Sequence, residues 1–100
     1  MGFNTELLHG TKTGDPVTGA TLTPVYQSSA FFQPSAEQHE KLFHNKAAGY
    51  SYTRINNPTI AAFEERMTVL EKGVASVACA SGMAAITNAL LNIVGSGDEI

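Results

Sequence analysis

The sequence predicts an α/β fold in which helices cover the faces of a parallel sheet. Three observations lead to this prediction. A helical pattern over residues 57–72 is followed by a short apolar run, "VASVACA" at 74–80, and a second helical pattern occupies 81–94. Short apolar runs that contain β-branched residues are typical of strands buried on both faces, which occur in parallel sheets. The last six residues, "GSGDEI", predict a turn into another strand.

The segments before residue 57 predict little regular structure. Residues 4–9 predict one short helical turn that ends at Gly10. Residues 11–34 are rich in Thr, Ser, Gly and Pro, and their aromatic side chains follow no helical period. A long irregular segment is uncommon in a compact domain, so we predict an arm that lies on a partner surface. Residues 35–45 predict a short polar helix that begins at Ser35.

The helix over 57–72 carries the clearest signals. Asn57 suits the N-cap position and Pro58 suits the first helical position. Apolar side chains recur on one face at helical spacing, namely Ile60, Phe63, Met67 and Leu70. We expect Gly73 to end this helix in a left-handed conformation.

A parallel strand needs a neighbour on each edge and helices on both faces. The chain offers one such strand and the beginning of a second, so we expect it to be part of a larger, truncated α/β domain. The predicted division is an arm over 1–56, followed by the start of this α/β domain over 57–100.

Composition excludes several classes of function. Six Lys and Arg residues stand against nine Asp and Glu residues, which disfavours a general nucleic-acid binder. No apolar run approaches the roughly 18 residues of a membrane span. The first ten residues lack a basic segment followed by an apolar one, so we expect no secretory signal. The single Cys79 favours a reducing, cytoplasmic setting. The three histidines show no metal-binding spacing, so no metal site is predicted.

The first candidate site lies in "YSYTRINNPT" at 50–59. Tyr50, Tyr52 and Arg54 alternate, which predicts that they share one face of an extended segment. A guanidinium group binds phosphate through two parallel hydrogen bonds, and the Tyr52 phenol adds another donor. The alternative is a surface arginine stacked on a tyrosine.

The second candidate site is Ser81-Gly82-Met83, between the predicted strand and helix. The first N–H groups of a helix have no internal partner and lie at the positive end of its dipole, so they attract anions. Gly82 leaves room for a phosphate, and Met83 offers its N–H. The alternative is an ordinary N-cap followed by a small residue that allows close packing.

Taken together, "TGATLTPVYQSS", "YSYTRINNPT", "LEKGVASVACASGMAAI" and "GSGDEI" make the chain from about Thr5 to Ile100 resemble a known family. It is the Cys/Met-metabolism family of pyridoxal-phosphate-dependent enzymes, and the resemblance is to its N-terminal part. Within the family the chain most resembles O-acetylhomoserine sulfhydrylases. The resemblance implies a type I, aspartate aminotransferase-like large domain, pyridoxal 5'-phosphate as cofactor, and a homo-oligomer, expected to be a dimer of dimers.

The resemblance also implies roles for particular residues. The backbone amides of Gly82 and Met83 would hold the cofactor phosphate, and Tyr52 and Arg54 would reach the phosphate of a neighbouring subunit. Residues 11–32 would pack across subunits. The Schiff-base lysine would lie beyond residue 100, so no catalytic residue is assigned here. The lysines of the chain are expected to be surface residues, namely Lys12, Lys41, Lys46 and Lys72.

The expected reaction is replacement of a γ-substituent by sulfur on a small amino acid, giving homocysteine or methionine. Methionine γ-lyase and cystathionine γ-synthase are alternatives, because γ-lyases and γ-synthases often have Met where many sulfhydrylases have Gln and this chain has Met83. A short non-catalytic phosphate-binding or assembly module is a further alternative.

Overall fold

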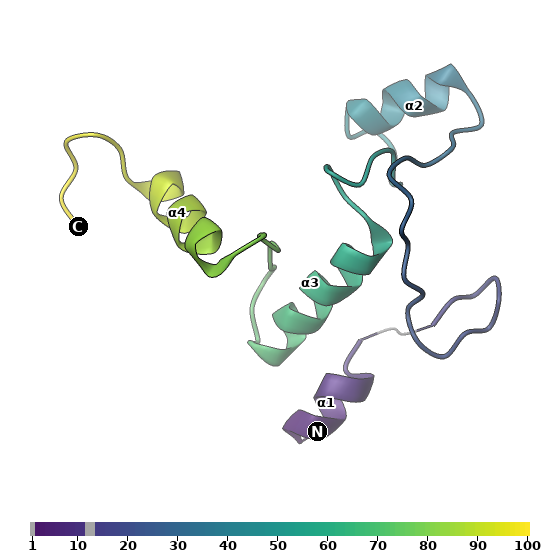
Figure 1. The fold of residues 1–100 in the computed structure, drawn as a ribbon, viewed down its shortest axis with the longest axis horizontal. Helices are drawn as coiled ribbons and strands as arrows, with labels where there is room; N and C mark the ends of the chain where they lie inside the picture. The colour runs from purple at the N-terminus through teal and green to yellow at the C-terminus, as the bar shows by residue number, and fades with distance from the viewer. Residues whose placement is uncertain (1, 12–13) are drawn as a thin grey trace.

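The structure, a computed structural model, describes residues 2–11 and 14–100, and this part contains four helices (Figure 1). They are α1 (Phe3–His9), α2 (Ala36–Phe43), α3 (Pro58–Leu70) and α4 (Gly82–Ile93). All four helices were predicted from the sequence. In the described part, α1 packs against α3, and no other pair of helices makes extensive contact. None of these helices is long and apolar enough to cross a bilayer.

The predicted N-caps of α2, α3 and α4 are confirmed. Ser35, Asn57 and Ser81 each have an extended backbone, and the side-chain oxygen of each accepts a hydrogen bond from a backbone N–H of the first turn. Pro58 occupies the start of α3, where its missing N–H removes no helical hydrogen bond. The beginnings of these helices are therefore determined by local sequence.

The end of α3 differs by one residue from the prediction. Lys72, not Gly73, has the positive φ of 53°. The N–H of Lys72 donates to the Val69 carbonyl at 3.1 Å, and the N–H of Gly73 donates to the Thr68 carbonyl at 2.9 Å. These two hydrogen bonds form a Schellman motif, in which the residue with the left-handed backbone is followed directly by the residue that donates the longer-range bond. Here Lys72 is the left-handed residue, and Gly73 donates the longer-range bond to Thr68.

The strand predicted at 74–80 is not formed, so the described residues do not show the expected α/β character. The described residues contain one isolated antiparallel bridge, between Ala30 and Tyr52, and no continuous ladder. A strand exists through its pairing with neighbours, and none is available to residues 74–80 in the described part of the chain. The "GSGDEI" segment likewise forms a turn, in which the Gly95 N–H donates to the Asp98 carboxylate at 2.6 Å.

Residues 74–80 instead run back along α3 (Figure 1). The hydroxyls of Thr68 and Ser76 lie 2.9 Å apart in a hydrogen bond. Two residues further on, the Ala78 N–H donates to the Glu64 carboxylate at 2.8 Å. The Glu64 side chain therefore satisfies a backbone N–H that a neighbouring strand could satisfy in a sheet.

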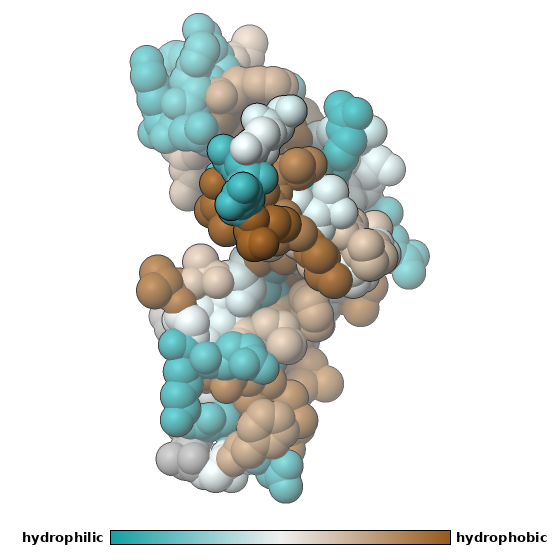
Figure 2. All heavy atoms as spheres, turned by 90° about the vertical axis from the view of Figure 1, so that its left-hand side faces the viewer, coloured by the Kyte–Doolittle hydropathy of each residue, from teal (hydrophilic) through white to brown (hydrophobic). Residues whose placement is uncertain are grey.

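The described residues bury no hydrophobic side chain. The radius of gyration is 16.9 Å, whereas a compact chain of this length has about 13 Å. Figure 2, viewed from the side of α4, shows apolar side chains lying open on the surface. The apolar face predicted for α3 is exposed at Ile60 and Phe63, and in the arm Phe32 is 93% exposed. Hydrogen bonds rather than a core define the local geometry of this chain.

In the arm, Asp15 organises a tight turn. Its carboxylate accepts hydrogen bonds from the Thr18 hydroxyl at 2.7 Å and from the Val17 N–H at 3.1 Å. The Thr18 hydroxyl, and then the Val17 amide, hold the pKa of Asp15 below its ordinary value.

Candidate functional site

The Arg54 segment is a turn, which corrects the extended geometry predicted for it. The Tyr52 carbonyl accepts hydrogen bonds from the N–H groups of Ile55 at 2.9 Å and Asn56 at 3.1 Å. The extended course therefore ends at Tyr52, and Arg54 lies within the turn. The sequence gives little warning of this turn, because Asn56 is the only residue of "TRIN" that favours turns.

Arg54 and Tyr52 are neighbours on the surface. The guanidinium carbon lies 5.5 Å from the centroid of the Tyr52 ring, within the range of a cation–π contact. Both residues are exposed, and no carboxylate in the described part of the chain forms a salt bridge with Arg54. The guanidinium N–H groups are thus free to bind an anion. The same geometry would also suit a surface arginine stacked on tyrosine.

Tyr50 serves a different purpose from Tyr52. Its ring lies 5.7 Å from the Phe31 ring, centroid to centroid, and its carbonyl accepts a hydrogen bond from the Gln33 side chain at 2.6 Å. Tyr50 is half-buried. It therefore joins the arm to the segment before the turn and does not share the exposed position of Arg54.

The entrance of α3 contains a polar junction around Asn57, which is only 2% exposed. Its side-chain oxygen caps the helix by accepting from the Thr59 N–H at 2.8 Å. Its side-chain nitrogen donates to the Tyr26 carbonyl and to the Thr53 hydroxyl, each at 3.1 Å. The sequence predicted the cap but missed the two donor bonds. The only signal for them was the choice of asparagine, which carries both an acceptor and donors.

The N-terminus of α4 offers two backbone donors. The Ser81 hydroxyl accepts from the Ala84 N–H at 3.1 Å. The N–H groups of Gly82 and Met83 have no acceptor among the described residues. A Cβ atom built on Gly82 would meet no atom within 4 Å. The open space and the two free amides fit a phosphate group.

The two halves of the predicted site make no direct contact in the described residues. Tyr52 and Arg54 precede α3, whereas Gly82 and Met83 open α4 at the far end of the returning segment (Figure 1). Both halves consist of hydrogen-bond donors, so an anion would be needed to join them.

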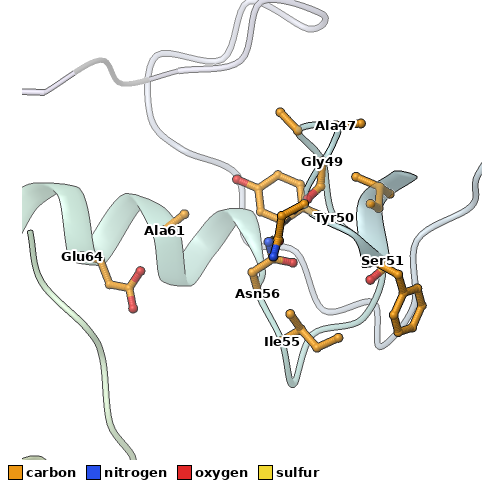
Figure 3. Close-up of a pocket in the computed structure, with 12 residues that line it drawn as sticks. Ala47, Gly49, Tyr50, Ser51, Ile55, Asn56, Ala61 and Glu64 are labelled. Atoms are coloured by element: carbon orange, nitrogen blue, oxygen red, sulfur yellow. Dashed lines mark hydrogen bonds between the residues drawn. The ribbon is translucent and has the colours of Figure 1, made fainter. Parts of the chain in front are cut away.

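An open hollow of about 900 Å³ lies elsewhere, between α2, the segment before the turn, and α3 (Figure 3). Tyr50, Asn56 and Ala61 are among its lining residues, with Glu64 at its edge. None of the four predicted cofactor-binding residues lines this hollow. We therefore do not assign the phosphate to it.

The described lysines show no catalytic environment. Lys41 forms an exposed ion pair with Glu37 at 2.8 Å, one helical turn away. Lys46 and Lys72 are exposed. Lys12 lies outside the described residues.

The comparison with protein families identifies the chain. Residues 4–100 match the family described as "Cys/Met metabolism PLP-dependent enzyme". The chain belongs to this family, whose members depend on pyridoxal phosphate.

Curated relatives cover several activities of sulfur amino-acid metabolism. The chain is 46% identical over 99 residues to the O-acetyl-L-homoserine sulfhydrylase of Corynebacterium glutamicum, covering 99% of this chain and 23% of that protein. It is 46% identical over 100 residues to the cystathionine gamma-lyase of Bacillus subtilis, covering all of this chain and 24% of that protein. It is also 41% identical to an L-methionine gamma-lyase of Pseudomonas deceptionensis, covering 25% of that protein. The chain thus spans about a quarter of the length of these relatives.

Solved structures support the same fold family. A crystal structure from Campylobacter jejuni, described as a "putative O-acetylhomoserine (thiol)-lyase" with a pyridoxyl-lysine phosphate, matches with a TM-score of 0.87 and 31% identity. The match covers 98% of this chain and 24% of that one. The cystathionine gamma-lyase of Lactobacillus plantarum, complexed with L-serine, matches with a TM-score of 0.76 and 39% identity, over 98% of this chain and 23% of that one. The arrangement of the four helices is therefore that of a segment of these type I enzymes, although the strand at 74–80 is unpaired here.

Proposed function

We propose that this chain is the N-terminal part of a pyridoxal-phosphate-dependent O-acetylhomoserine sulfhydrylase. In the proposed reaction the bond between the γ-carbon and the ester oxygen of O-acetylhomoserine breaks, and a bond between the γ-carbon and sulfide sulfur forms. Acetate leaves and homocysteine results. The observation that supports this proposal is the 46% identity to an O-acetyl-L-homoserine sulfhydrylase, together with a TM-score of 0.87 to a structure described as a "putative O-acetylhomoserine (thiol)-lyase".

The cofactor, when bound, acts as an electron sink for the substrate carbon atoms. The chain's proposed contribution is binding and orientation. The N–H groups of Gly82 and Met83 would donate to the cofactor phosphate at the positive end of α4. The Arg54 guanidinium would form charge-assisted bonds with the phosphate of a neighbouring subunit, and the Tyr52 phenol would add a further donor. These contacts would fix the cofactor while other parts of the enzyme act on the substrate.

The proposed assembly is a homo-oligomer, a dimer of dimers, in which residues 1–56 form the arm and 57–100 begin the cofactor-binding domain. The exposed aromatic and β-branched side chains of the arm, such as Phe32 and Val25, support a role at a subunit contact. A cytoplasmic location is also proposed, because the chain's single cysteine is a free thiol.

A γ-lyase is the second candidate. The 46% identity to a cystathionine gamma-lyase and the 41% identity to an L-methionine gamma-lyase favour it, and Met83 agrees with it. A γ-lyase would eliminate the γ-substituent without adding sulfide.

The test is an assay of the full-length protein encoded by the gene, loaded with pyridoxal phosphate. O-acetylhomoserine with sulfide is compared with methionine alone and with cystathionine alone. We expect homocysteine from the first mixture at a kcat/KM well above that of either elimination. Faster release of methanethiol from methionine, or of cysteine from cystathionine, would establish the lyase instead. No turnover of any substrate, together with no cofactor binding, would favour a non-catalytic module.

A further inference from the structure

We propose that Asn57 is a positioning residue that holds the Tyr52–Arg54 turn in place for anion binding. This inference rests on the proposed function, in which Arg54 binds the cofactor phosphate. It assigns to Asn57 a task beyond capping α3. Because Arg54 itself is exposed and makes no hydrogen bond to another described residue, its position depends on how the turn is anchored.

Asn57 is the one buried residue in the described part of the chain, at 2% exposure. A buried polar side chain is costly unless all its hydrogen bonds are made. Here the oxygen accepts from Thr59, and the nitrogen donates to Tyr26 and to Thr53. The side chain thus joins the arm, the turn and α3 at one point.

Hydrogen bonds at Thr53 restrain the backbone directly before Arg54. The Thr53 hydroxyl donates its one hydrogen to the Ser28 carbonyl and accepts from Asn57. The Thr53 N–H donates to the Ser29 carbonyl at 2.8 Å. The Asn57 nitrogen is the donor in their shared bond, because a side-chain NH2 group donates and does not accept. Three hydrogen bonds therefore fix the residue that directly precedes Arg54.

The arm is held at the same point. The backbone N–H of Tyr26 donates to the Thr59 hydroxyl at 2.9 Å, and its carbonyl accepts from Asn57. Both backbone groups of Tyr26 are thus bound to the first turn of α3. A change at Asn57 would loosen the turn and the arm together.

Capping alone does not explain asparagine at this position. Serine and aspartate cap helices about as well. Aspartate would place an oxygen against the Tyr26 carbonyl, and serine is too short to reach both acceptors while it caps. Asparagine combines the capping oxygen with two N–H donors.

The test is a double-mutant cycle on the full-length protein, with the dissociation constant of pyridoxal phosphate as the readout. The four proteins are the wild type, Asn57→Ser, Arg54→Ala and the double variant. Serine keeps a capping hydroxyl and adds no charge, so α3 retains its N-cap. We expect Asn57→Ser to weaken cofactor binding about tenfold in the wild-type background, a loss of the size measured for coupled residues, and less than twofold in the Arg54→Ala background.

Two results would overturn the inference in distinguishable ways. An equal loss in both backgrounds would show that Asn57 stabilises the fold without acting through Arg54, and the proposed role of Arg54 would stand. No effect of Arg54→Ala on cofactor affinity would refute the phosphate role of Arg54 itself, and the positioning role with it.

A second pair of variants covers the case in which Asn57→Ser does not fold. Thr53→Val removes the hydroxyl that joins Asn57 to the turn and leaves the cap of α3 intact. Thr53→Ser is the matched control because it keeps that hydroxyl. We expect Thr53→Val to weaken cofactor binding and Thr53→Ser to retain it. Wild-type affinity in Thr53→Val would contradict the proposal.

Discussion

The phosphate site at α4 can be tested by a matched pair of substitutions at Gly82. Gly82 is the first residue of α4, and the backbone of Ser81 before it is extended, with φ −153° and ψ 161°. Proline favours the first helical position, and the residue before proline favours an extended backbone. Gly82→Pro should therefore preserve the helix. Gly82→Ala is the control because both variants add a Cβ, which meets no atom within 4 Å in the chain. They differ in the backbone N–H.

The size of the effect follows from the number of hydrogen bonds removed. Gly82→Pro deletes one of the two free N–H groups, and a hydrogen bond to a charged group contributes about 1.5–3 kcal/mol. We expect pyridoxal phosphate to bind the proline variant about ten- to a hundredfold more weakly than the alanine variant. The assay is a titration of the cofactor-free, full-length protein with pyridoxal phosphate, followed by absorbance. Thermal unfolding of the cofactor-free variants checks that α4 is retained.

If the proline and alanine variants, both folded, bound the cofactor equally well, the proposed contact would be refuted. This result would show that the Gly82 N–H does not bind the phosphate. Weak binding by both variants would instead show that a methyl group alone blocks the site, and the amide would have no demonstrated role.

Four further predictions follow from the same geometry. Met83→Leu should bind pyridoxal phosphate within a few-fold of the wild type, because only its N–H is proposed to touch the phosphate; a titration that gave a tenfold loss would implicate the side chain. Glu64→Ala should speed hydrogen exchange of the Ala78 amide about tenfold or more, because the hydrogen bond from this half-buried N–H to the charged carboxylate contributes about 1.5–3 kcal/mol. Glu64→Gln keeps an acceptor and should change the exchange less; unchanged exchange in Glu64→Ala would contradict the role of this bond. Mixing Arg54→Ala subunits with Gly82→Pro subunits should restore part of the activity if the two sites act across subunits, and activity that stays absent at every mixing ratio would indicate a site within one chain. The 100-residue polypeptide, incubated with pyridoxal phosphate and then borohydride, should show no site-specific labelling of one particular lysine by peptide mass spectrometry. A specific adduct at one lysine would overturn this expectation.

Local signals predicted the helices and their beginnings. Ser35, Asn57 and Ser81 were identifiable as N-caps because capping depends on a side chain and a backbone N–H within the same turn. The end of α3 was misplaced by one residue, because a Schellman motif admits Lys72 at the left-handed position next to Gly73. This difference of one residue leaves the number and order of the helices unchanged.

Non-local structure was predicted less well. The apolar run at 74–80 has the composition of a buried strand, but pairing requires neighbours that the described residues do not supply. The bonds from Thr68 and Glu64 to this run could not be predicted, because no sequence pattern links a polar helix position to a distant segment of the chain. Similarly, the alternation of Tyr50, Tyr52 and Arg54 predicted an extended row. Two hydrogen bonds to the Tyr52 carbonyl turn the chain instead.

The bonds along α3 bear on which chain's phosphate Arg54 would serve. The first bond joins residues 68 and 76, and the second joins 64 and 78. Four helical residues rise about 6 Å, and two extended residues about 6.6 Å, so the returning segment keeps pace with the helix. Six more helical residues, about 9 Å, lead from Glu64 back to Pro58. Four more extended residues, at most about 13 Å, lead from Ala78 to Gly82.

The chain bends at Ala80 and Ser81, so it falls short of this limit. The returning segment nevertheless runs back towards the end of α3 at which the Arg54 turn lies. Position along α3 alone does not separate a site within one chain from a site shared between chains. A shared site requires only that a two-fold axis pass near this end of α3, because each Arg54 would then face the Gly82 amide of the other subunit. Both groups are donors with no anionic partner in the described part of the chain, so a phosphate between them would satisfy both at once. The two-fold rotation would thus give every site the α4 amides of one subunit and the Arg54 guanidinium of the other. This is the arrangement for which the mixed subunits should regain activity.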